Sequence, residues 1–161
     1  MSNTLKDIMA YDEAHYFGIG DTITLGGVIT ELSENANPTE SEKQYIHEKS
    51  KRVTTTGFSN EFPITMDMVK GDTVYEDFYN LFYLRKTGSD LIRDHYIVNL
   101  WEPIADTANT YKCRKISQTV SITEATNAPG EQKTMSGSLK GGDFVYGTFN
   151  TSTKTFSENA D

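Results

Sequence analysis

Alternation of hydrophobic and polar residues dominates the pattern along the chain. In Phe62-Pro-Ile-Thr-Met-Asp-Met68 every second residue is apolar, which is typical of a strand with one buried face. Residues 21–32, 93–101, 111–123, 133–139 and 143–149 have a similar strand-like character. The glycine pair at 141–142, between the last two of these segments, predicts a hairpin turn. The pattern therefore predicts a mainly β chain.

One segment, Gly71–Arg85, departs from this alternation and has a helical period. Thr73 and Glu76 have the spacing of a capping box, which predicts the start of the helix. Its apolar side chains fall on one stripe, which we expect to be the core face of the helix: Val74, Phe78, Leu81 and Phe82. We therefore expect an α+β domain, a β-sandwich flanked by one α-helix.

Three segments are too polar to contribute much to a core. Residues 33–56 begin with a polar run and end in β-branched residues, which predicts a long loop or protruding hairpin. Residues 1–20 have no sustained period and are expected to be an N-terminal arm. Residues 150–161 are expected to be a polar C-terminal arm. We expect all of them to belong to a single domain that spans residues 1–161.

Composition narrows the possible functions. The chain has 161 residues, 36% of them hydrophobic, and a net charge of -8. This sign argues against a general nucleic-acid binder, which usually has a basic surface. With Cys113 as the single cysteine no internal disulfide can form, so we expect folding in the cytosol. The sequence has no apolar run of signal-peptide or membrane-span type, and we expect no membrane association.

The sequence offers no recognisable catalytic, cofactor-binding or metal-binding motif. His15, His47 and His95 are far apart and form no metal-ligand spacing. We expect His95, inside a strand, to have a structural or surface role. Cys113 is interpreted as a small core residue, and the glycine pairs lack the Lys-Ser/Thr of a phosphate-binding loop. We therefore expect no cofactor and no enzymatic activity.

The order of these elements resembles that of the major tail (tail tube) proteins of long-tailed bacteriophages. The polar insertion precedes the strand Phe62–Met68, the helix follows directly, and the strand His95–Trp101 comes next. The phrases Thr119-Val-Ser-Ile-Thr-Glu124 and Met135-Ser-Gly-Ser-Leu139 resemble the closing strands of that family. The resemblance covers roughly residues 20–150.

The resemblance implies a structural subunit that assembles into hexameric rings, which stack into a tube for DNA ejection. It also implies a location in the virion tail after synthesis in the host cytoplasm. The implied partners are further copies of the chain, a tape measure protein and tail terminator or distal tail proteins. DNA would pass through the lumen without specific binding. We expect the following residues at subunit interfaces: Tyr16, Phe17, Tyr45, Ile46, Lys49, Lys51 and Arg52.

Two alternatives stay open. The chain could be the tube subunit of a contractile injection system or of a phage-like bacteriocin, because related rings occur there. It could also be a small β-sandwich that binds carbohydrate, because tyrosine rings and Trp101 suit the faces of sugars if they are exposed. Their alternation favours placing these aromatic residues in a core or a subunit interface.

Overall fold

The computed structural model describes residues 5–159. In this range the chain forms one α-helix, α1 (Thr73–Tyr83), and two 3-10 turns, η1 (Ala10–Asp12) and η2 (Gly88–Leu91). All other regular structure is β. The strands are β1 (Glu13–Ile19), β2 (Thr22–Leu25), β3 (Ile29–Leu32), β4 (Pro38–Lys43), β5 (Arg52–Phe58), β6 (Glu61–Asp67), β7 (Ile92–Pro103), β8 (Thr110–Thr126), β9 (Thr134–Lys140), β10 (Phe144–Asn150) and β11 (Thr155–Glu158). The mainly β, α+β class predicted from the sequence is confirmed.

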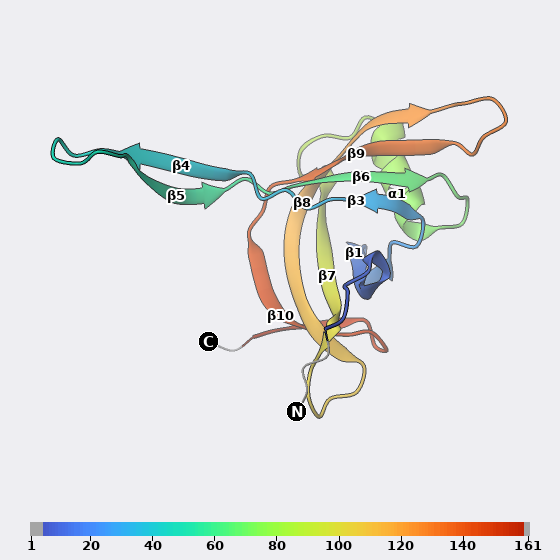
Figure 1. Ribbon diagram of the computed structural model, residues 1–161. Helices are drawn as coiled ribbons and strands as arrows, with labels where there is room; N and C mark the ends of the chain where they lie inside the picture. Colours follow the sequence, from blue (N-terminus) through green and yellow to red (C-terminus); the bar gives the residue numbers. More distant parts are fainter. Residues whose placement is uncertain (1–4, 160–161) are drawn as a thin grey trace.

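Nine of these strands form one antiparallel sheet that folds over itself. The strand β8 joins its two layers because it is long, with 17 residues. The first half of β8 pairs with β7 and β10, and the second half pairs with β9. One layer is therefore β11-β10-β8-β7-β1-β2 and the other is β8-β9-β6-β3. Figure 1 shows β8 curving from the direction of β7 and β10 into that of β9 and β6.

The predicted hairpin at Gly141-Gly142 is wrong. Strands β9 and β10 do not pair with each other but follow one another along the same side of β8. Both glycines have positive φ, 84° and 87°, which residues with a side chain rarely adopt. A side chain at Gly142 would also collide with the carbonyl oxygen of Ser117 in β8. The glycine pair turns the chain from one layer into the other while both strands stay paired with β8.

The main core lies between the two layers and α1. Strand β6 confirms the alternation expected for Phe62–Met68, since Phe62, Ile64 and Met66 are buried and the residues between them are half-buried. These side chains meet α1 and the inner faces of the other strands. The remaining buried members of this cluster are Phe17, Val74, Phe78, Leu81, Ile97, Val120, Met135 and Leu139.

The helix lies where the sequence predicted it, with two differences. Its N-cap is Asp72, whose Oδ1 accepts a hydrogen bond of 2.9 Å from the backbone N–H of Tyr75, so Thr73 is not the cap. Three residues of the predicted stripe, Val74, Phe78 and Leu81, are buried, but Phe82 is half-buried at the margin.

A bidentate ion pair between the Asp77 carboxylate and the Arg93 guanidinium ties the helix to β7, with distances of 2.8 and 3.1 Å. This hydrogen bonding raises the pKa of Arg93.

The second part of the expected N-terminal arm is part of the sheet. Strand β1 pairs with both β2 and β7, so only residues before Glu13 precede the sheet. Its sequence has no sustained alternation because side chains on both faces of β1 are buried. Phe17 packs into the main core, whereas Tyr16 joins a second cluster on the opposite face with Tyr96, Val98, Cys113 and Phe149.

The expected C-terminal arm is also partly structured. Strand β11 pairs with β10, and Phe156 packs against the second cluster. Residues 1–4 and 160–161 of the two predicted arms lie outside the described residues.

Candidate assembly interface

The hairpin β4–β5 is the one two-stranded unit in the described part of the chain that stands apart from the large sheet. Its strands pair from Pro38↔Phe58 at the base to Lys43↔Arg52 at the tip. All six residues of β4 are exposed, and Figure 1 shows the hairpin projecting away from the body of the protein. An isolated two-stranded hairpin is at best marginally stable in water, so a packing partner would stabilise it. The long polar hairpin expected from the sequence is therefore present and extends to Phe58.

The tip of the hairpin gathers an aromatic ring, an aliphatic side chain and several charges. The Tyr45 ring has the Lys43 ammonium 4.9 Å and the Arg52 guanidinium 5.4 Å from its centroid. The neighbouring Ile46 is fully exposed. Arg52 also pairs with Glu48 at 2.7 Å. The tip therefore combines an exposed aliphatic side chain with a tyrosine ring that has cations over its face. Such a surface is suited to contact with another protein.

The base of the hairpin is fixed to the body. Arg114 of β8 donates two hydrogen bonds of 2.8 Å to the Glu34 carboxylate, which raises the pKa of Arg114. The backbones of Asn35 and Glu61 exchange hydrogen bonds of 2.9 Å. Asn37 takes a left-handed φ of 46°, and its side-chain amide donates to the carbonyl of Ser59 at 3.1 Å. The hairpin thus projects from an ordered base.

Five of the seven interface residues predicted from the sequence lie on this hairpin. Tyr45, Ile46 and Lys49 are exposed in the turn, Lys51 pairs with Glu42 at 3.2 Å, and Arg52 begins β5. Their contact with a neighbouring subunit stays a prediction.

The structure corrects the other two predicted interface residues. Tyr16 is 8% exposed and Phe17 is 1% exposed, so both are core residues of the protomer. They are buried because a hydrophobic cluster packs against each face of β1.

Sequence reasoning missed other exposed apolar residues and the free strand edges. On β5, Val53 is 55% exposed and Phe58 is 65% exposed. The sequence has one signal of this exposure. Both residues belong to a segment with β-branched residues but without apolar residues at every second position, so the strand has no face that must be buried. Among the described strands, β2 pairs only with β1, β3 only with β6, and β11 only with β10. Each of these three strands therefore has one edge whose backbone groups could pair with another chain.

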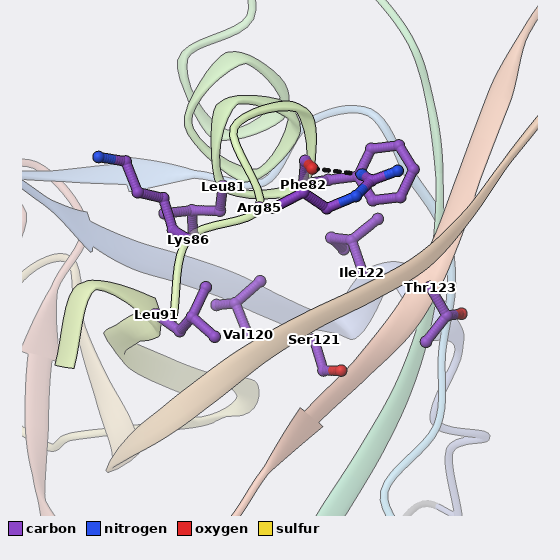
Figure 2. A pocket seen from close by; sticks show the side chains of 9 residues that line it. All are labelled: Leu81, Phe82, Arg85, Lys86, Leu91, Val120, Ser121, Ile122 and Thr123. Atoms are coloured by element: carbon purple, nitrogen blue, oxygen red, sulfur yellow. Dashed lines mark hydrogen bonds between the residues drawn. The ribbon is translucent and has the colours of Figure 1, made fainter. Parts of the chain in front are cut away.

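The hollow at the C-terminal end of α1 is not built for catalysis (Figure 2). Its floor is aliphatic, formed by Leu81, Leu91, Val120 and Ile122. The Arg85 guanidinium donates to the Phe82 carbonyl at 2.6 Å and lies 4.5 Å from the centre of the Phe82 ring. Figure 2 shows the Lys86 side chain directed away from the other lining residues. The hollow therefore has no acid–base pair with which to act on a substrate.

Other reactive side chains are also in structural settings. Cys113 is buried, and burial raises the pKa of its thiol to about 12, which keeps it protonated and a poor nucleophile. Within residues 5–159, no three His, Cys, Asp or Glu side chains come together as a group that could hold a metal ion. The one α-helix of this range is too short and too polar to cross a membrane.

Comparisons with known proteins identify structural similarity without sequence similarity. No family model matches the sequence, and no curated protein is detectably similar to it. Among solved structures, a chain in the tail of an empty gene transfer agent (GTA) particle, refined with helical C6 symmetry, aligns with a TM-score of 0.61 and 9% identity. The alignment covers 87% of this chain and 98% of that one.

Two further solved structures have the same arrangement. A chain in the virion of a native GTA particle aligns with a TM-score of 0.57 and 8% identity, over 87% of this chain and 98% of that one. A chain in the six-fold symmetrised baseplate of the anti-feeding prophage (AFP) aligns with a TM-score of 0.52 and 7% identity, over 91% and 97% of the two chains. This chain therefore has a fold that occurs in the tails and baseplates of phage-like particles.

Proposed function

We propose that the chain is a structural subunit of a phage-like tail, which assembles into hexameric rings that stack into a tube. The fold supports this proposal, since the similar chains come from particles described with C6 or six-fold symmetry. The observation that carries it is the hairpin β4–β5, which projects from an ordered base and exposes Tyr45 and Ile46. A surface of this kind suits a subunit whose packing is completed by its neighbours.

In this proposal the hairpin contacts an adjacent subunit through Tyr45, Ile46, Lys49, Lys51 and Arg52. The free edges of β2, β3 and β11 offer backbone groups to neighbouring chains, and closure of a ring would pair such edges. The net charge of -8 would let DNA move through a lumen without adhering to its wall. The further partners are a tape measure protein and tail terminator or distal tail proteins, and the location is the tail of a virion.

A tube or baseplate subunit of a contractile injection system or bacteriocin is the second candidate. The similarity to a chain of the AFP baseplate favours it. The ring-forming role is the same in both candidates, and they differ in the particle that contains the ring. Particles purified from cells that carry the gene would distinguish them, because a tail that ejects DNA is attached to a DNA-containing head, whereas an injection system or bacteriocin has no such head.

A shortened hairpin tests the proposed role of the tip. Lys43 and Arg52 are the last paired residues, so replacing residues 44–51 by Asn-Gly would close the strands with a two-residue turn. We expect this variant to fold with an unchanged urea midpoint, because the tip lies outside both core clusters. We expect it to form no tubes in electron micrographs.

A second variant keeps the hairpin at full length and changes only Tyr45 and Ile46 to Ser. It separates the contribution of side-chain contacts from that of length, and we expect it to weaken stacking as well. Tubes of normal length from both variants would contradict the proposed role of the tip.

A further inference from the structure

A continuous chain of polar side chains crosses the main core from β1 to β9. The Glu13 Oε1 atom lies 3.1 Å from His15 Nε2, and His15 Nδ1 lies 2.9 Å from His95 Nε2. On the far side, His95 Nδ1 lies 2.9 Å from Gln118 Oε1, and Gln118 Nε2 donates to the Leu139 carbonyl at 3.4 Å. His95 and Gln118 are buried polar residues in an otherwise apolar region. Such groups are stable there only when their hydrogen bonds are satisfied.

The Leu139 carbonyl fixes the direction of this chain. A carbonyl oxygen only accepts, so the Gln118 amide nitrogen must face it and the Gln118 oxygen must face His95. His95 therefore carries its proton on Nδ1. Its ring lies parallel to that of Phe17 at 4.7 Å, and burial lowers the pKa of His95 to about 3, so the ring is neutral. The Nε2 atom of His95 is then an acceptor, and His15 Nδ1 must donate to it.

The second ring nitrogen of His15 also carries a proton. Its Nε2 atom faces the Glu13 carboxylate, whose oxygens accept when ionised. The pKa of Glu13 is lowered, mainly by its hydrogen bond with His15, so this carboxylate is charged at neutral pH. Both ring nitrogens of His15 thus carry a proton. In a neutral His15, one of the two contacts would place lone pairs against each other.

The charged groups around His15 support this assignment. Arg114 lies across Ile97 from His15 and is held by Glu34. Lys112 pairs with Glu102 at 3.9 Å in the next row of the sheet. Arg114 and Lys112 therefore each have a carboxylate other than Glu13 as partner.

Other titratable groups on neighbouring elements complete the environment. Glu31 of β3 and Tyr11 of η1 line the hollow into which Glu13 and His15 also project. Asp12 of η1 accepts a hydrogen bond from the backbone N–H of Met9. Of these groups, Glu13 is the carboxylate in contact with His15.

We propose that Glu13, His15, His95 and Gln118 form a proton-dependent latch that holds the first part of β1 on β7 and β8. The latch is closed when His15 carries both protons. Loss of the second proton turns the contact between Nε2 and the Glu13 carboxylate from attraction into repulsion, and protonation of Glu13 in acid removes the ion pair. Its site is the point where the N-terminal segment enters the sheet. The latch exists within one protomer and does not depend on the proposed assembly.

The ring nitrogens of the three histidines in the full-length protein give a direct test. Nitrogen-15 NMR shifts at pH 7 report which ring nitrogens carry protons. We expect two protons on His15 and a single Nδ1 proton on His95. His47, exposed in the hairpin turn, gives the reference signals of a histidine outside this chain of contacts. A neutral His15 at pH 7, or a proton on Nε2 of His95, would overturn the proposal.

The latch itself is tested with the variant Glu13→Gln. We expect His15 to be neutral at pH 7 in this variant and the amides of β1 before Phe17 to exchange about tenfold faster, as expected when one charge-assisted hydrogen bond is lost. Amides of β6 should be unchanged. The control Glu40→Gln, on exposed β4, should change neither quantity. Unchanged exchange in β1 of the Glu13→Gln variant would exclude a latch.

Discussion

Acidification should destabilise the protein through His95. The folded protein keeps this ring neutral, with a pKa lowered from 6.5 to about 3, chiefly by burial. The unfolded chain binds a proton below pH 6.5, so the unfolded state holds more protons between pH 6.5 and 3. The free energy of unfolding should therefore fall as the pH decreases through this window. One pKa unit corresponds to about 1.4 kcal/mol, so at pH 5 the loss from His95 is about 2 kcal/mol.

Urea unfolding at pH 7 and pH 5 measures this loss against the variant His95→Gln. The variant loses the parallel ring contact with Phe17 and should be less stable at both pH values. It has no titrating group at this position, so its stability should change by about 2 kcal/mol less between the two pH values. The control His47→Gln removes an exposed histidine and tests whether the loss of any histidine has the same effect. Equal pH dependence in the wild type and His95→Gln would show that His95 is not kept neutral by the fold.

Three further predictions concern the fold. Gly137→Ala should destabilise the protein by about 1–3 kcal/mol in urea unfolding, because its Cβ would lie 2.1 Å from the Ser121 carbonyl oxygen, whereas Gly57→Ala, with open space around it, should be nearly neutral. Asp72→Ala should lower the free energy of unfolding by about 1 kcal/mol through loss of the N-cap, which the same urea titration would detect. Cys113 should react with thiol reagents only on global unfolding, and fast labelling of the native protein would contradict its burial.

Local signals in the sequence were sufficient for elements with one buried face. The strand around Ile64 and the helix around Phe78 each show their own period, so both could be located from the sequence. Tyr16 and Phe17 are buried on opposite faces of β1, and a strand covered on both sides carries no alternation. Gly142 suggested a hairpin because a local pattern cannot reveal that β9 and β10 share β8 as a partner.

The candidate interface was predictable only in part, for a related reason. Polarity and length indicated the hairpin, and its tip includes Tyr45 and Ile46 as expected. The ion pair that fixes its base, Arg114 with Glu34, joins residues 80 positions apart. The contact between His15 and His95 spans the same distance in sequence. Pairings of this kind are created by the fold and have no signature in one sequence.

Cryo-electron microscopy of the purified full-length protein, at several salt and protein concentrations, tests the proposed function most directly. We expect rings of six subunits that stack into tubes, with the hairpin β4–β5 in contact with a neighbouring subunit. A protein that stays strictly monomeric under all of these conditions would contradict it.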